Sequence, residues 1–209
     1  MKIIGLAYRE GIEKIILKSD SSLRNGRKPF YSPENMLRAA VHPCIAFRIG
    51  RMGKHILPQY AWRYIDSYAP SLHIEDWDTV QNAHREQTDL TLATAMDYSQ
   101  PVGEWILVKD IDLESKNPHS EAYNKSRFTF YKHNKVSDIA NDEVIADKII
   151  LHLTDRIEDV IAKISDVLTL RQGDIVFLAS KAAPFIVREN NCITASMGDK
   201  ENLLFCKIK

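Results

Sequence analysis

The alternation of apolar and other residues along residues 41–49 organises the prediction of the fold. The spacing has the period of two that is typical of a half-buried strand. One face of this predicted strand is apolar and consists of Val41, Ile45, Phe47 and Ile49. The other face carries His42, Cys44, Ala46 and Arg48. We assign the first face to the core and expect the second to point toward a groove.

Short strands are also predicted near both ends of the chain. The apolar stretches Met1–Tyr8 and Ile12–Leu17 precede a turn at Asn25-Gly26, and Ile106–Val108 predicts a further strand. The last part of the chain alternates short strands with turns and closes on Leu203–Ile208. Its turns are predicted at Gly173-Asp174, Asn190-Asn191 and Gly198-Asp199.

Two segments have the apolar spacing of a helix. Residues 58–68 place aromatic side chains at helical spacing, and Pro70 should end that helix. Residues 155–168 form one apolar stripe, with Asp155 and Glu158 as a capping pair. The acidic stretch 72–78 is predicted to be a loop that leads into the first turn of a helix. The polar stretch 112–126 is predicted to be an exposed loop that could move as a flap.

Composition narrows the class of protein. The 209 residues suit one domain, with residues 1–35 as a short N-terminal segment and 36–209 as the main β-rich part. Basic and acidic residues number 28 each, so the charge pattern favours neither nucleic acid nor a membrane surface as a partner. No apolar stretch is long enough to span a membrane, and three cysteines at irregular spacing favour a reducing compartment. We therefore expect a soluble cytoplasmic protein of the α+β class, mostly β, with a few packed helices.

Seven motifs follow one another in the order typical of a known family. They are Lys18–Leu23, Pro29–Pro33, His42–Ile56, Ala61–Tyr68, Asp97 with Pro101–Trp105, Ile164–Asp174, and Gly198-Asp199. In this order the chain resembles the fumarylacetoacetate hydrolase family over nearly its whole length. The resemblance implies a mixed β-roll fold and a homodimer. It also implies that active relatives use a magnesium-type ion to polarise a keto-acid for hydrolysis, isomerisation or decarboxylation.

The metal-binding residues that this resemblance implies are absent. Where active relatives read His-Tyr-Glu-Val-Glu-Leu, this chain reads His-Pro-Cys-Ile-Ala-Phe, so the two carboxylates fall on Cys44 and Ala46. The aspartate that supplies the third ligand falls on His73. Magnesium takes oxygen ligands, and these three residues offer at most one negative charge, on the thiol. We therefore predict that the hard-metal site is lost and that the protein needs no cofactor.

The catalytic positions that the resemblance implies are also altered. The lid histidine falls on Gly11, the arginine of an Arg-Asp pair on Trp77, and a lysine on Thr94. The acidic residues Asp78 and Asp97 remain. In the loop that holds the substrate's acid group in relatives, the remaining polar residues are Ser180 and Lys181.

These losses predict a non-catalytic member of the family, a pseudoenzyme. Without the ion there is no Lewis acid for a carbonyl and no activated water. The scaffold would then serve for dimerisation, for pairing with an active relative, or for binding a small acid without turning it over.

Two alternatives remain open. One is a metal-dependent hydrolase, isomerase or decarboxylase of keto-acids, of the fumarylacetoacetate hydrolase or 2-hydroxyhepta-2,4-diene-1,7-dioate isomerase type, with a rearranged site. Its carboxylates would come from Glu75, Asp76, Asp78 or Glu104. The other is a zinc or iron protein that uses His42, Cys44 and His73, because imidazole and thiolate are suited to softer metals. Cys192 and Cys206 have no metal-ligand spacing and are assigned to packing.

Overall fold

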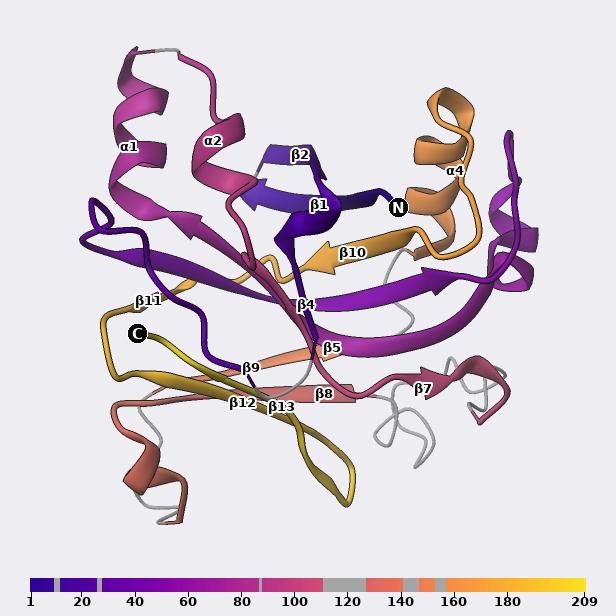
Figure 1. Ribbon diagram of the computed structural model, residues 1–209. Coiled ribbons are helices and arrows are strands. Elements are labelled where there is room, and N and C mark those ends of the chain that lie inside the picture. The colour runs from indigo at the N-terminus through magenta and orange to yellow at the C-terminus, as the bar shows by residue number, and fades with distance from the viewer. Residues whose placement is uncertain (10–11, 26–27, 87, 111–126, 141–146, 153–156) are drawn as a thin grey trace.

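Two β-sheets stacked on one another form the body of the protein in the computed structural model (Figure 1). The structure describes residues 1–9, 12–25, 28–86, 88–110, 127–140, 147–152 and 157–209. The larger sheet has nine strands and the smaller has four. Helices α1 (Trp77–Glu86) and α2 (Thr91–Thr94) lie on the side of the large sheet away from the small one (Figure 1), whereas the buried residues of α4 (Ile157–Val167) join the core that also contains Phe128 and Phe130 of the small sheet. The arrangement confirms the predicted α+β fold, mostly β.

The large sheet contains both parallel and antiparallel strand pairs. It combines the strands of residues 3–107 with two strands from residues 175–187. Its main path, in spatial order, is β2 (Ile12–Lys18), β1 (Ile3–Arg9), β10 (Ile175–Ala179), β4 (Ala39–Ile49), β5 (Ile65–Asp76), β6 (Gln100–Val102) and β3 (Leu23–Asn25). Two short strands pair beside this path, β11 (Phe185–Val187) with β4 and β7 (Ile106–Leu107) with β5. Strand β1 pairs in parallel with β10. The pairing places the N-terminal strands in the same sheet as a strand near the C-terminal end of the chain.

The small sheet is antiparallel and is built from strands between residues 127 and 207. Its order is β13 (Lys200–Lys207), β12 (Cys192–Met197), β8 (Arg127–His133) and β9 (Asp147–His152). Gly198 makes the turn between β12 and β13 with a φ of +55°, a conformation that glycine adopts readily. The predicted turn at this position is therefore confirmed.

The helical elements are short. The α-helices are α1 (Trp77–Glu86), α2 (Thr91–Thr94) and α4 (Ile157–Val167). The 3₁₀ helices are η1 (Asp20–Ser22), η2 (Pro58–Tyr64), η3 (Val108–Asp110) and η4 (Val136–Ala140). None of the helices in the described ranges is long and apolar enough to cross a membrane. The predicted apolar stripe of α4 is confirmed by its buried residues Ile157, Val160, Ile161 and Ile164.

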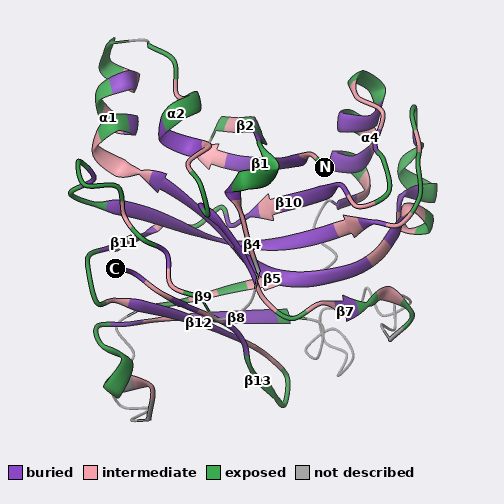
Figure 2. Ribbon diagram, viewed as in Figure 1, coloured by how far each residue is buried: buried purple, intermediate pink, exposed green. Residues whose placement is uncertain are grey.

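The face of β4 that carries Val41, Ile45, Phe47 and Ile49 packs toward the small sheet, and we call it the inner face. These side chains join a core that includes Phe128 and Phe130 of β8 and Ile161 of α4. The predicted core face is therefore confirmed. Strands β4 and β5 are buried along most of their length (Figure 2).

The other face of β4 differs from the prediction. Cys44 and Ala46 do not point into an open groove, because both side chains are buried on what we call the opposite face, whereas the buried His42 borders a small pocket. Cys44 and Ala46 belong to a second, smaller core with Ile16, Ala69 and Phe177. The sequence pattern cannot show this, because the side chains that cover the face come from β2, β5 and β10.

Two element predictions were wrong at the same strand. Residues 58–68 do not form one helix: a 3₁₀ helix ends at Tyr64 and β5 begins at Ile65. The stretch 72–78 ends in the first turn of a helix, as predicted, because α1 begins at Trp77, but the predicted loop before it is strand β5, which continues to Asp76. Both errors have one cause, namely that pairing with β4 along the whole of β5 outweighs the local signals. The predicted flap 112–126, the residue Asp155 and the turn residue Gly26 lie outside the described residues.

Candidate functional site

The opposite face of the β4–β5 pair carries most of the buried polar side chains that could do chemistry. Strands β4 and β5 are antiparallel, with His42 opposite His73, Cys44 opposite Ser71 and Ala40 opposite Glu75. Because directly paired residues point to the same side of a sheet, all these side chains share one face. The register therefore brings His42, Cys44, His73 and Glu75 together.

Glu75 is the centre of this group. Its Oε1 accepts a hydrogen bond from His42 Nε2 at 3.1 Å. Its Oε2 lies 3.3 Å from His73 Nε2, although the angle is too poor for a hydrogen bond. Burial favours the neutral carboxyl, but the hydrogen bond from His42 and the nearby His73 ring outweigh it and lower the pKa of Glu75 well below its usual value. Glu75 is therefore a buried carboxylate, with 1% of its surface exposed.

A buried ammonium from a distant strand accompanies this carboxylate. Lys18 is the last residue of β2, and its Nζ donates to Ser99 O at 3.0 Å and to Ser99 Oγ at 2.9 Å. Burial lowers the pKa of Lys18 to about 7, while electrostatic interactions with Cys44 and Glu75 act to raise it. Lys18, His42, His73 and Glu75 together are called the ion cluster below.

Cys44 and His73 are both held in their neutral forms. Burial raises the pKa of the Cys44 thiol far above its usual value, and the Cys44 Sγ–H donates to His42 O at 3.1 Å. Burial, with the positive charge of Lys18, lowers the pKa of His73 to about 3. Neither residue supplies the negative charge that a hard cation requires.

An aromatic ring fills the remaining space on this face. Phe177 of β10 pairs with Ala46 and stacks on the His73 ring, with 5.5 Å between the ring centroids. The ring also lies over Gly5, where an added Cβ would come within 2.3 Å of it. Phe177 therefore lies against the two positions, Cys44 and Ala46, at which the family resemblance implies carboxylates.

The positions implied for magnesium do not fit that ion. Cys44 is a neutral thiol, Ala46 has no donor, and His73 offers only a buried imidazole. In the described part of the chain, no three His, Cys, Asp or Glu side chains are grouped so as to hold a metal ion. The softer zinc or iron site at His42, Cys44 and His73 stays a prediction.

The implied catalytic residues are scattered. Trp77 and Asp78 lie at the start of α1, where Asp78 forms an ion pair with Arg38. Thr94 is buried, and its hydroxyl donates to backbone carbonyls of its own helix. Asp97 is exposed. Gly11 lies outside the described residues.

The other candidate carboxylates have structural roles or lie apart. Asp76 accepts hydrogen bonds from Asp78 N at 3.1 Å and from Thr79 Oγ1 at 2.6 Å, which caps α1. Glu104 is exposed beside β13, where its backbone N–H donates to Leu203 O. Of the four carboxylates proposed for a rearranged site, Glu75 is the one that meets the histidines.

A small pocket opens beside the ion cluster. It has a volume of about 220 Å³, and His42, Glu75, Trp77, His84, Tyr8 and Lys181 are among the residues that line it. Ser180, from the loop expected to hold a substrate's acid group, is buried, and its Oγ accepts a hydrogen bond from Ala182 N at 3.0 Å. The structure thus brings His42, Glu75, Trp77 and Lys181 to one pocket, which we call the mouth pocket.

Sequence reasoning missed the roles of Lys18 and Phe177. The signal for Lys18 was available, since Ile16 and Lys18 share one face of a strand by period two. A lysine on a buried strand face requires a buried partner. No local signal could have placed Phe177 on His73, because the contact depends on the order of the strands.

Comparison with known proteins agrees with the fold and the motifs. A sequence profile described as fumarylacetoacetate (FAA) hydrolase C-terminal matches residues 8–199. The chain belongs to the fumarylacetoacetate hydrolase family. A search by sequence among curated proteins found no match.

Solved structures of the fumarylacetoacetate hydrolase family share the fold. A family protein from Yersinia pestis CO92 is 17% identical, with a TM-score of 0.78 over 100% of this chain and 92% of that one. A 5-carboxymethyl-2-hydroxymuconate delta-isomerase from Mycobacterium smegmatis is 16% identical, with a TM-score of 0.72 over 99% and 78%. A 2-hydroxyhepta-2,4-diene-1,7-dioate isomerase from Mycobacterium marinum is 18% identical, with a TM-score of 0.72 over 99% and 73%. At these identities the likeness concerns the fold.

Proposed function

We propose that this protein is a non-catalytic member of the fumarylacetoacetate hydrolase family, whose fold is stabilised without a divalent metal. The observation that carries the proposal is the ion cluster. Lys18 is buried with its Nζ held by Ser99, and below its pKa of about 7 its positive charge acts on the buried Glu75. An ammonium that is attached to the chain balances Glu75 without exchange with solvent.

The chemistry of the cluster supports the proposal. A metal in this family would polarise a carbonyl and activate a water molecule, and neither role passes to a buried ammonium that is bound to Ser99. Both Lys18 and His73 are covered from solvent, at 2% and 0% exposure, so a substrate would not reach them. The remaining role is to hold the β2, β4 and β5 strands together.

The mouth pocket supports a binding role for the scaffold. Lys181 and His84 could attract a small acid, and His42 could hydrogen-bond to it. We therefore include binding of a small acid, without turnover, in the proposed function. Association into a homodimer, or with an active relative, is the other part of the proposal.

The compartment is proposed on the cysteines. Cys44, Cys192 and Cys206 are all free and buried. Free thiols persist in the reducing cytoplasm, and we place the protein there.

The experiment that tests the proposal measures metal binding and turnover on the same purified protein. Magnesium or manganese should leave the melting temperature unchanged, whereas a ligand at 100 times its Kd would add about 2.7 kcal/mol of stability. Keto-acids offered for hydrolysis, isomerisation or decarboxylation should remain at the buffer rate. A magnesium-dependent shift together with turnover would overturn the proposal.

The second candidate function is an enzyme with a rearranged site, and one observation favours it. His42 and Glu75 are hydrogen-bonded to each other and both line the mouth pocket. A histidine held by a carboxylate is a common general base. Turnover that is lost in Glu75→Gln, but kept in the control Asp166→Asn at an exposed residue of α4, would favour this candidate over the first.

The assembly is tested separately. Light scattering at micromolar concentration should give about twice the monomer mass for a homodimer. A monomer at high concentration would remove the homodimer and leave pairing with a relative.

A further inference from the structure

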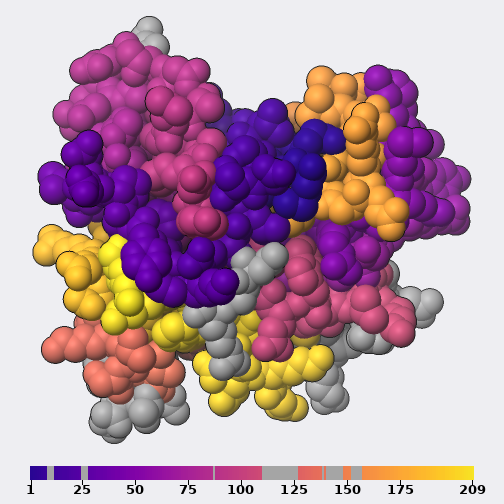
Figure 3. Space-filling model, viewed as in Figure 1, coloured from indigo at the N-terminus to yellow at the C-terminus, as the bar shows by residue number. Residues whose placement is uncertain are grey.

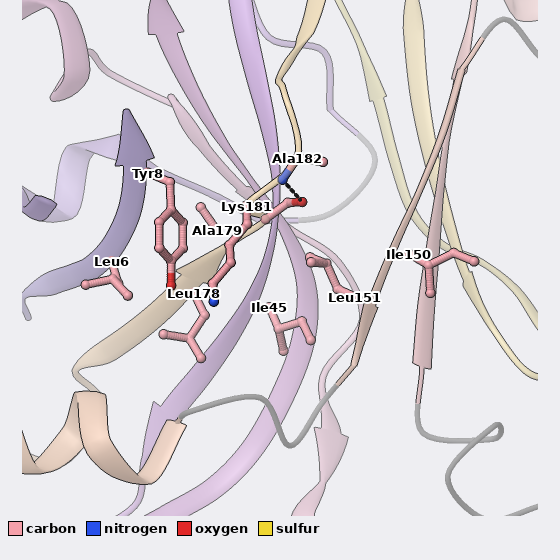
Figure 4. A pocket seen from close by; sticks show the side chains of 10 residues that line it. Leu6, Tyr8, Ile45, Ile150, Leu151, Leu178, Ala179, Lys181 and Ala182 are labelled. Carbon is pink, nitrogen blue, oxygen red and sulfur yellow. Dashed lines mark hydrogen bonds between the residues drawn. The ribbon is translucent and has the colours of Figure 1, made fainter. Parts of the chain in front are cut away.

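A second and larger pocket lies on the inner face of the large sheet, on the other side of β4 from the ion cluster (Figure 4). Its volume is about 450 Å³, within the range of about 300–1,000 Å³ that is typical of small-molecule sites. It shares Tyr8 and Lys181 with the mouth pocket but contains neither His42 nor Glu75. We call it the inner pocket.

The floor of the inner pocket is a row of aliphatic side chains across three neighbouring strands. Leu6 of β1 pairs with Leu178 of β10, and Leu178 pairs with Ile45 of β4. The opposite wall comes from the small sheet, where Ile150 and Leu151 of β9 line the pocket. Ile150 remains 41% exposed, so apolar surface on this wall is open to a ligand. Leu6 and Ile45 are already buried, so a hydrocarbon chain laid along this row would remove apolar surface from water at Ile150 and at the half-buried Leu178 and Leu151.

One end of the aliphatic row carries a positive charge. Lys181 follows β10, and its Nζ lies 5.5 Å from the centroid of the Tyr8 ring. Figure 4 shows the Lys181 side chain beside that ring, at the end of the pocket formed by Tyr8. Among the described residues, no carboxylate forms an ion pair with Lys181, whose side chain is exposed. A ligand's anionic group could therefore reach this ammonium without displacing a protein partner.

We propose that the inner pocket binds an amphipathic carboxylate, a saturated monocarboxylic acid of medium chain length. Its hydrocarbon chain lies along Leu6, Leu178 and Ile45, and its carboxylate lies at Lys181. This inference is independent of the ion cluster, since it uses the other face of the sheet. The proposed ligand also differs from the small acid of the mouth pocket, because the aliphatic row favours a ligand that has a hydrocarbon chain.

Calorimetric titration of the full chain with four probes tests the ligand class. Octanoate should bind, and decanoate should bind more tightly by about fourfold per added methylene. Acetate, which lacks the chain, should not displace octanoate from the inner pocket, and octylamine, whose charge is repelled by Lys181, should give no binding. Octylamine binding as tightly as octanoate, or no octanoate binding at all, would overturn the proposal.

Variants of the full chain test the place of binding. Lys181→Met should raise the Kd for octanoate by about fivefold, which corresponds to the upper end of the range for an exposed ion pair. The matched control is Lys209→Met, because Lys209 also lies over a tyrosine ring, that of Tyr31, at 5.6 Å, but lines neither pocket. The control should bind octanoate as the unmodified protein does, and an equal loss in both variants would contradict the placement of the carboxylate.

A second pair of variants separates the two pockets. Ile150→Glu places a charge on the open wall of the inner pocket and should weaken octanoate by on the order of tenfold. Because Ile150 is partly exposed, this variant should keep the native melting temperature within a few degrees. His84→Ala alters the mouth pocket alone and should leave octanoate binding unchanged. Loss of binding in His84→Ala, with none in Ile150→Glu, would move the ligand to the mouth pocket and overturn this proposal.

Discussion

The two faces of the large sheet are both buried, but by different physical means. On the inner face, Ile45, Phe47 and Ile49 meet the aromatic side chains of the small sheet, and the stabilisation comes from apolar area removed from water. On the opposite face, Lys18 and Glu75 are buried among histidines, so two charges lose their hydration and must stabilise each other. One strand, β4, carries both faces.

Under the proposed function, this difference explains how the fold would be stable without a metal ion. The inner face is stabilised by the packing of apolar side chains, and this stabilisation does not require a metal ion. The opposite face needs a balance of charge, and Lys18 with Glu75 supplies that balance from within the chain. The molecular surface is consistent with this, since the N-terminal strands lie between the α1–α2 region and α4 (Figure 3). Lys18 reaches the cluster from one of those strands.

The largest effect is expected from a change on the inner face. Phe47 is fully buried and meets the Trp62 ring edge-on at 6.0 Å. Phe47→Ala should lower the free energy of unfolding by about 4 kcal/mol, through lost apolar burial and the cavity that remains. Urea unfolding measures it. The control Leu92→Ala, at a side chain that is 88% exposed, should change stability by less than about 0.5 kcal/mol. A Phe47→Ala loss as small as the control's would mean that the inner face is not the main core.

The next effect distinguishes charge balance from simple packing on the opposite face. Below the Lys18 pKa of about 7, Lys18→Met and Glu75→Gln should each destabilise the fold. Each loss should be about 3 kcal/mol, because each variant leaves one buried charge unbalanced. The double variant should lose less than the sum by about 2 kcal/mol.

Urea unfolding of the two single variants and the double variant measures this coupling. The matched control combines Lys18→Met with Asp166→Asn, since Asp166 is an exposed residue of α4 that pairs with His55. That pair should be additive within about 0.5 kcal/mol. Additive losses for Lys18 and Glu75 as well would show that Lys18 only anchors Ser99, and the comparison of the two faces would fail.

A smaller effect concerns pH. The pKa of Lys18 is about 7 in the folded protein, against an ordinary value of 10.5. Between these values the unfolded chain binds more protons than the folded one, so the free energy of unfolding rises with pH. From pH of about 7 to about 9 the rise should be on the order of 2 kcal/mol, since one pKa unit corresponds to about 1.4 kcal/mol. The stability gained in this window is lost again as the pH falls toward 7.

Urea unfolding at several pH values measures this slope. Lys18→Met should flatten it, because the variant removes the group whose pKa differs between the folded and the unfolded chain. An unchanged slope in Lys18→Met would assign the pH dependence to another residue.

The smallest effect is at Cys44. Its thiol is fully buried with a raised pKa, so native protein should react slowly with thiol reagents, and Cys192 and Cys206 should also be protected. In unfolded protein, all three thiols should react with the reagent. Cys44→Ala should lower stability by only about 1 kcal/mol, because one sulfur atom is removed. Rapid reaction of Cys44 in the native protein would mean that the opposite face is open.

Much of the fold could be predicted because its signals are local. The alternation along 41–49 predicted β4 and its core face, and the apolar stripe predicted α4. Glycine marked the turn before β13. The end of β5 could not be predicted in this way, since Glu75 and Asp76 have the composition of a loop, and only pairing with Ala39 and Ala40 makes them a strand.

The sequence by itself determined the family and the absence of carboxylates at residues 44, 46 and 73, because both depend on residue identity in a known order. Only the tertiary structure decided what replaces them. Lys18 meets Ser99 across 81 residues, and Glu75 meets His42 across 33. The physical reason is that a charge can be buried only where partners from other strands balance it. Local periodicity in the sequence does not specify the order of strands in a sheet, so it does not specify those partners.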